Sequence, residues 1–163
     1  MPTVTGLHCE VAMFLLCALG AYIEERGLGR IHTAPFQMKT GPDLPGRAPD
    51  LQFVGTRELR RLHRMYLDGP ADLVVEIVTT ASRRTDRVLK FREYEQGGVR
   101  EFWLIDPERC RAEFYRRRRD GRFSVMDVGM DAILRSGVVK GLWLRVHWLW
   151  ERPALLTFSA SGS

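Results

Sequence analysis

Apolar runs alternate with polar and glycine-rich stretches along the chain, and this alternation predicts its secondary structure. Residues 8–26 carry apolar side chains at helical spacing and are followed by Gly27 and Gly29, which predicts a helix with Thr5 as its N-cap. The predicted helix is apolar on nearly every side, so we expect it to be buried, with Cys17 in the core. Short apolar runs bounded by turn residues predict strands at 30–39, 50–54, 73–78 and 101–106.

The remaining pattern predicts a second helix and a hairpin. Residues 85–96 have helical spacing and are followed by two glycines. Asp120-Gly121 separates two apolar runs, 114–118 and 123–128, which is a strong signal for a β-hairpin. The aromatic segment 142–150 favours a strand or a short helix. This order of elements indicates an α/β or α+β sheet with helices on its faces.

The composition is that of an ordinary globular domain, with 163 residues, 45% hydrophobic and 28% charged. It excludes a disordered chain and a large multidomain enzyme, and we expect one domain over residues 1–152 with a flexible tail at 153–163. The formal net charge of +5 is compatible with a polyanionic partner but does not prove one. The three cysteines form no CxxC pattern, which favours the reducing cytoplasm without structural zinc or disulfides. The apolar run Val11–Ile23 is shorter than a membrane span needs, so we expect no membrane partner.

Glu76 is the most informative residue, because it lies in the middle of the apolar run 73–78. A carboxylate on a buried strand must be paired, protonated or bound to a metal, since an unpaired buried charge is strongly destabilising. Two interpretations remain open. Glu76 points to a sheet edge or pairs with an arginine, or it lies beside a second acid and holds a divalent cation.

Asp50 and Lys90 are the candidate partners of Glu76. Asp72 shares the strand face of Glu76, but four residues of strand separate the two by about 13 Å, too far to share one ion. Asp50 lies on a separate strand that can be adjacent, although an aspartate after a proline is also common in turns. Lys90 borders the apolar side of the following helix and can reach Glu76; alternatively, it is solvated and pairs with Asp86.

The order Pro49-Asp50, then Glu76 within a strand, then Lys90 resembles the PD-(D/E)XK nuclease signature with its lysine moved onto the next helix. More narrowly, the chain is similar to the Uma-two family of restriction-endonuclease-like proteins over roughly residues 8–150. The matching stretches are Ala48–Val54, Asp72–Val78, Asp86–Lys90 with Tyr94, Gly98-Val99, Glu101–Pro107, Leu134–Ser136 and Gly141–Leu144.

The resemblance implies an α/β, restriction-endonuclease-like core, in which a mixed central β-sheet is flanked by α-helices and extended by the β-hairpin. It also implies an endonuclease that hydrolyses DNA with Mg²⁺ or Mn²⁺, with Asp50 and Glu76 as metal ligands and Lys90 as the catalytic lysine. The alternative is a non-catalytic nucleic-acid-binding or structural homodimer module with the same fold. An acidic segment that family members usually carry before the position of His8 is not present here, which favours this alternative.

Partners follow from the same interpretation. Arg83, Arg84 and Arg87 lie near the expected site and are the candidate contacts to DNA phosphates, with solvated surface as the alternative. We also expect a homodimer, because the tryptophans near the C-terminus alternate with aliphatic residues and suit either a core or a dimer face.

Overall fold

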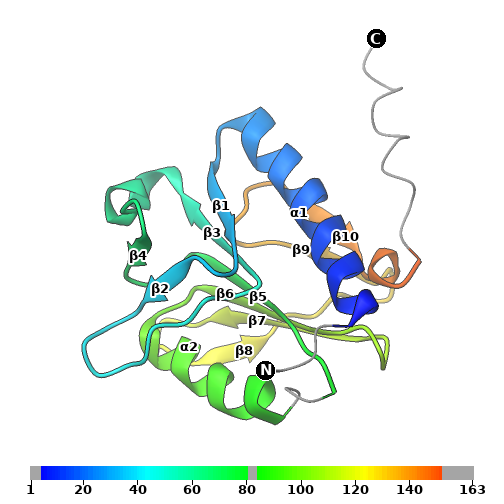
Figure 1. Cartoon of the computed structure of the whole chain (residues 1–163). Helices are drawn as coiled ribbons and strands as arrows, with labels where there is room; N and C mark the ends of the chain where they lie inside the picture. Colours follow the sequence, from blue (N-terminus) through cyan, green and yellow to red (C-terminus); the bar gives the residue numbers. More distant parts are fainter. Residues whose placement is uncertain (1–4, 81–83, 152–163) are drawn as a thin grey trace.

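The computed structural model describes residues 5–80 and 84–151, in which helices α1 and α2 lie on opposite faces of a central β-sheet (Figure 1). The helical elements are α1 (Gly6–Arg26), the short 3-10 turn η1 (Thr56–Arg61), the π-helical turn η2 (Thr85–Lys90), α2 (Phe91–Gly97) and η3 (Val146–Leu149). The strands are β1 (Gly29–Thr33), β2 (Gln37–Lys39), β3 (Leu51–Gly55), β4 (Tyr66–Asp68), β5 (Leu73–Ile77), β6 (Glu101–Asp106), β7 (Arg111–Arg117), β8 (Phe123–Val125), β9 (Ile133–Arg135) and β10 (Trp143–Arg145).

The central sheet has six strands in the order β1-β3-β5-β6-β7-β8. Within it, β5 and β6 pair in parallel and the other neighbours pair antiparallel. Side chains alternate between its two faces: Val75 and Ile77 pack with α1, whereas Val74 and Val78 pack with Tyr94 of α2. The predicted mixed sheet flanked by helices is therefore confirmed.

α1 begins as predicted, since Thr5 Oγ1 accepts a hydrogen bond from the His8 backbone N–H at 3.2 Å. It ends at Gly27, whose φ of 60° is in the left-handed region that glycine tolerates. The predicted burial on all sides is wrong, and so is the core position of Cys17, which is exposed. The sheet covers one side of the helix and buries the stripe Val11, Phe14, Leu15, Leu19 and Ile23.

α1 is longer than the apolar run Val11–Ile23, from which its length was judged too short for a membrane span. The helix has 21 residues and, by length and composition alone, is the one helix in the described part of the chain that meets the requirement for crossing a membrane. In this fold its apolar stripe packs against the sheet.

The predicted strand 30–39 divides into two elements. β1 pairs antiparallel with β3, whereas β2 pairs in parallel with β4 in a separate two-stranded sheet. Pro35 lies between them and has no N–H to donate to a sheet ladder, which explains the break. The hairpin of β7 and β8 is confirmed, with Gly121 at φ 83° in its turn. The predicted second helix forms as η2 followed by α2, and segment 142–150 contains both alternatives, strand β10 and turn η3.

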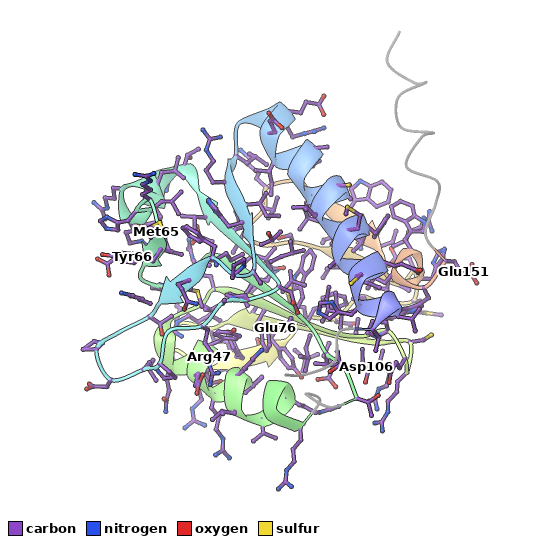
Figure 2. The ribbon with its side chains drawn as sticks, viewed as in Figure 1. Arg47, Met65, Tyr66, Glu76, Asp106 and Glu151 are labelled. Atoms are coloured by element: carbon purple, nitrogen blue, oxygen red, sulfur yellow. The ribbon has the colours of Figure 1, made fainter. Side chains whose placement is uncertain are left out.

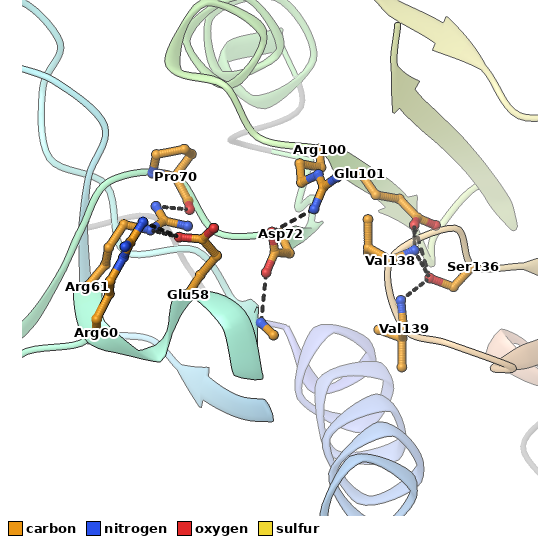
Figure 3. A network of polar contacts seen from close by, with 11 residues as sticks. Glu58, Arg60, Arg61, Pro70, Asp72, Arg100, Glu101, Ser136, Val138 and Val139 are labelled. Carbon is orange, nitrogen blue, oxygen red and sulfur yellow. Dashed lines mark hydrogen bonds and ion pairs between the residues drawn. The ribbon is translucent and has the colours of Figure 1, made fainter. Parts of the chain in front are cut away.

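The carboxylate of Glu101 fastens the C-terminal segment to the central sheet (Figure 3). Glu101 is fully buried and accepts hydrogen bonds from Trp103 Nε1, Ser136 Oγ and the backbone N–H groups of Gly137 and Val138, all at 3.0–3.2 Å. This buried acid is therefore fully engaged with protein donors, in a region away from Glu76.

Candidate active site

Glu76 lies in the central part of the sheet, flanked by β3 on one side and β6 on the other (Figure 2). Every residue of β5 is buried, and Glu76 itself is 2% exposed. Its side chain contacts Tyr94 of α2, on the same face of the sheet as Val74 and Val78. The alternative that Glu76 points to a sheet edge is therefore excluded by its position.

Two donors from the helical layer meet the Glu76 carboxylate. Lys90 Nζ lies 3.1 Å from Oε2, and Tyr94 Oη donates to Oε1 at 2.5 Å. Lys90 and Tyr94 are four residues apart, so the helical turn presents both toward the same strand. The structure therefore brings Lys90 to Glu76, as the spacing predicts, while its catalytic role stays a prediction.

Asp50 lies where β3 and β5 stop pairing. The ladder of these strands ends at the pair Leu51 and Val75, and beyond it Asp50 Oδ2 accepts a hydrogen bond from the Ile77 backbone N–H at 2.7 Å. The Ile77 nitrogen is joined to the Glu76 Cα through the carbonyl carbon, that is, by two covalent bonds. Adding these bond lengths to the hydrogen-bond distance places Asp50 Oδ2 within about 5.6 Å of the Glu76 Cα. The side chain of Asp50 thus replaces a backbone acceptor at the point where the two strands diverge.

The two acids are held by different layers of the fold. Asp50 Oδ1 pairs with His8 Nε2 of α1 at 3.1 Å, whereas Glu76 is held by Lys90 and Tyr94. A carboxylate oxygen has about two lone-pair sites, so a single hydrogen bond does not use the full acceptor capacity of an oxygen. An ion bound by both carboxylates would have to lie between them, at the carboxyl end of β5.

The donor chemistry of this pair fits a magnesium ion. Mg²⁺ prefers carboxylate oxygens and is commonly bound by one or two carboxylates while it keeps several waters. Over residues 5–80 and 84–151, no group of three His, Cys, Asp or Glu side chains is arranged to hold a metal ion. Asp50 and Glu76, with the Ile77 carbonyl as a further candidate ligand, would therefore have to bind the ion together with water.

The three arginines that we predicted to contact DNA differ in their positions and contacts. Arg83 lies outside the described residues. Arg84 is exposed just before η2. Arg87 is 48% exposed and forms an ion pair with Glu113 of β7. Their contacts to DNA stay predictions.

Two residues near the site were not predicted as part of it. His8 has no sequence signal, because its partner Asp50 is 42 positions away. Asp106 ends the apolar strand β6 directly before Pro107, is 9% exposed and accepts a hydrogen bond from the Arg109 N–H at 3.2 Å. By strand alternation it shares the α2-facing side of the sheet with Leu104. An acid at the end of an apolar strand is the signal that could have identified it.

Comparison with known proteins supports the resemblance seen in the sequence. The model of the Uma2 family, described as "Putative restriction endonuclease", matches residues 1–147. No curated protein matches the chain. A solved structure described as "a putative nuclease belonging to DUF820" from Anabaena variabilis has a TM-score of 0.75 and 17% identity, and the match covers 92% of this chain and 83% of that one. The solved structure confirms the fold. Because the family model matches most of this chain, the chain belongs to the Uma2 family of restriction-endonuclease-like proteins.

Proposed function

We propose that this protein is a metal-dependent endonuclease that hydrolyses DNA phosphodiester bonds, with Asp50 and Glu76 as metal ligands and Lys90 as the catalytic lysine. The observation that carries the proposal is the buried Glu76 carboxylate, whose Oε2 lies 3.1 Å from Lys90 Nζ on a strand that Asp50 also contacts. Family membership supports the reaction class.

The position of Glu76 supports a functional origin for the acid. Buried ion pairs are often no more stable than apolar residues of similar volume, because desolvation offsets the attraction. The neighbours of Glu76 on β5 are valine and isoleucine, so an apolar side chain would suit this position at least as well. A carboxylate at that place is therefore better explained by chemistry than by stability.

The residues of the site divide the chemical work. A bound Mg²⁺ would lower the pKa of a coordinated water and neutralise charge on the attacked phosphate. Lys90 carries up to three N–H donors, which can orient the attacking water and stabilise negative charge on the phosphoryl oxygens. Tyr94 fixes one oxygen of Glu76, and the Ile77 N–H and His8 fix the carboxylate of Asp50. These bonds hold the acids in place before a substrate arrives.

The test combines cleavage and ion binding. Wild-type protein should nick supercoiled plasmid DNA with Mg²⁺ or Mn²⁺, and Glu76→Gln and Lys90→Met should each lose that activity. Asp72→Asn is the matched control, because Asp72 is also a buried carboxylate but bonds Gly55 and Arg100 outside the site (Figure 3). Wild-type protein that nicks no DNA with either ion and binds neither ion by calorimetry would show that the proposal is wrong.

The second candidate is a non-catalytic nucleic-acid-binding or structural homodimer module with the same fold. It is favoured by the protein donors that already engage both carboxylates in this structure. Its dimer face would include the outer side of α1, where Met13 is 58% exposed, and Trp143, which is 51% exposed. A thermal shift with Mn²⁺ distinguishes the candidates, because an ion that binds only the folded state raises the melting temperature.

A further inference from the structure

We propose that a hollow at the carboxyl ends of β5 and β6 binds a backbone phosphodiester of nucleic acid, through Arg109 and Arg111 together with Arg87. That the ligand is nucleic acid rests on the proposed function. The hollow contains about 310 Å³ of empty space, partly open to solvent.

Three separate elements build the walls of this hollow. Arg87 comes from η2, Arg109 from the turn after β6 and Arg111 from the first position of β7. The floor is apolar, since Val78 and Leu104 line it and are 3% and 6% exposed. Guanidinium groups beside a low-dielectric floor bind an anion more strongly than the same groups would on an open surface, because less water competes.

Two arginines of the hollow are available to bind an anion. Arg109 and Arg111 are exposed and form no ion pair with any carboxylate in the described part of the chain. The two acids that line the hollow already accept hydrogen bonds from protein groups: Asp106 from the Arg109 backbone N–H, and Glu113 from Arg87 and Tyr115. The unused positive charge of the hollow therefore resides on Arg109 and Arg111.

Glu113 already accepts a hydrogen bond from the Arg87 guanidinium, so Arg87 is available to a ligand only if that bond is exchanged. Its carboxylate accepts from Tyr115 Oη at 2.6 Å as well as from the Arg87 guanidinium. Burial and this hydrogen bond to Glu113 raise the pKa of Tyr115, so the phenol stays a donor. A phosphate that enters the hollow would compete with Glu113 for Arg87.

The hollow is close to the candidate active site. Leu104 is the direct neighbour of Glu76 across the parallel ladder, and Glu113 is the direct neighbour of Leu104 on β7. Val78 follows Glu76 by two residues, about 7 Å along the strand, on the same face. One strand of nucleic acid can therefore cross both places, with the bond to be cleaved near Glu76 and another phosphate in the hollow.

Fluorescence anisotropy with a labelled DNA duplex tests this inference, using the full chain in EDTA so that no cleavage occurs. Arg109→Gln and Arg111→Gln should each weaken DNA binding by about tenfold at low salt. Each should also reduce the slope of log K against log salt by about 0.9, the value for one lost phosphate contact. Glu113→Gln should strengthen binding, because it releases Arg87.

The matched controls are Arg26→Gln and Glu25→Gln. These residues pair with each other at the C-terminal end of α1, far from the labelled Asp106 at the edge of the hollow (Figure 2). They remove the same charges, so they measure the effect of net charge alone. Thermal unfolding of every variant checks the fold.

Variants at Arg109 and Arg111 that bind DNA as Arg26→Gln does would overturn the inference. It would also be overturned if these variants lost binding of inorganic phosphate in calorimetry but kept wild-type DNA affinity, because the hollow would then serve a free phosphate. Loss of DNA binding in the variants of a protein that never cleaves DNA supports the hollow and refutes only the nuclease. Normal cleavage with unchanged binding refutes only the hollow.

Discussion

Replacing the whole polar cluster around Glu76 tests whether that cluster is present for chemistry or for stability. Lys90→Met removes the ammonium from a carboxylate that is 2% exposed. Breaking a fully buried ion pair costs about 3–5 kcal/mol, and the 20% exposure of the Lys90 side chain lets water replace part of the interaction. We therefore expect Lys90→Met to lower the free energy of unfolding by about 2 kcal/mol.

The triple variant Glu76→Leu, Lys90→Met and Tyr94→Phe should behave differently. It removes the carboxylate together with Lys90 Nζ and Tyr94 Oη, the two donors that contact it, so this ion pair is replaced by apolar groups. Replacing a buried ion pair by apolar residues is commonly neutral or stabilising, and we expect this variant to be within about 1 kcal/mol of wild type or above it. It should nick no DNA.

Urea unfolding followed by tryptophan fluorescence measures both variants, since Trp103 is fully buried in β6 and reports on the core. The m-value should stay constant, so that a change in midpoint is a change in stability. A triple variant less stable than Lys90→Met would refute the reasoning, because the cluster would then be a net stabiliser and its charge would need no functional explanation.

Three further predictions concern stability outside the site. Glu101→Gln should destabilise by about 1–3 kcal/mol, because an amide puts a donor in front of the donors that now bind the carboxylate; urea unfolding measures it, and an unchanged midpoint would contradict the prediction. Burial and the nearby Arg30 lower the pKa of His32 from 6.5, so the folded chain resists a proton that the unfolded chain accepts. Stability should consequently fall as pH decreases below 6.5, and the loss should be smaller in His32→Gln when the two pH profiles are compared. Thr5→Ala should lower the free energy of unfolding by about 1 kcal/mol, because α1 loses its N-cap. Thr5→Ser should keep most of the wild-type stability in thermal unfolding, because its hydroxyl can still accept the hydrogen bond.

Local signals were sufficient to predict the contact between Glu76 and Lys90. A carboxylate among valines and isoleucines indicates a strand that is buried on both faces, and the structure buries every residue of β5. The four-residue spacing of Lys90 and Tyr94 predicts one side of a helix, and both residues contact Glu76. These inferences depend only on residues close in sequence.

Other features depend on which elements become neighbours, and the sequence does not contain that information locally. Cys17 was expected in the core because α1 is apolar on nearly every side, but only the sheet decides which side is covered. The contact of His8 with Asp50 joins the start of α1 to the start of β3. The hollow joins Arg87, which the sequence indicates as a candidate phosphate contact, to Arg109 from a different element, and the position of Arg109 follows no recognisable pattern.

The parallel pairing of β5 and β6 explains why the chemistry gathers at one place. Parallel neighbours cannot be joined by a tight turn, so the chain must cross from the carboxyl end of β5 back to the start of β6. Here the crossover contains η2 and α2 on the face opposite α1, and it brings Lys90 over Glu76 (Figure 1). The same pairing opens the carboxyl ends of both strands at one edge, where Asp106 and the arginines of the hollow follow. If both proposals hold, the acid pair and the phosphate site are two consequences of one topological requirement, and altering the crossover should impair both.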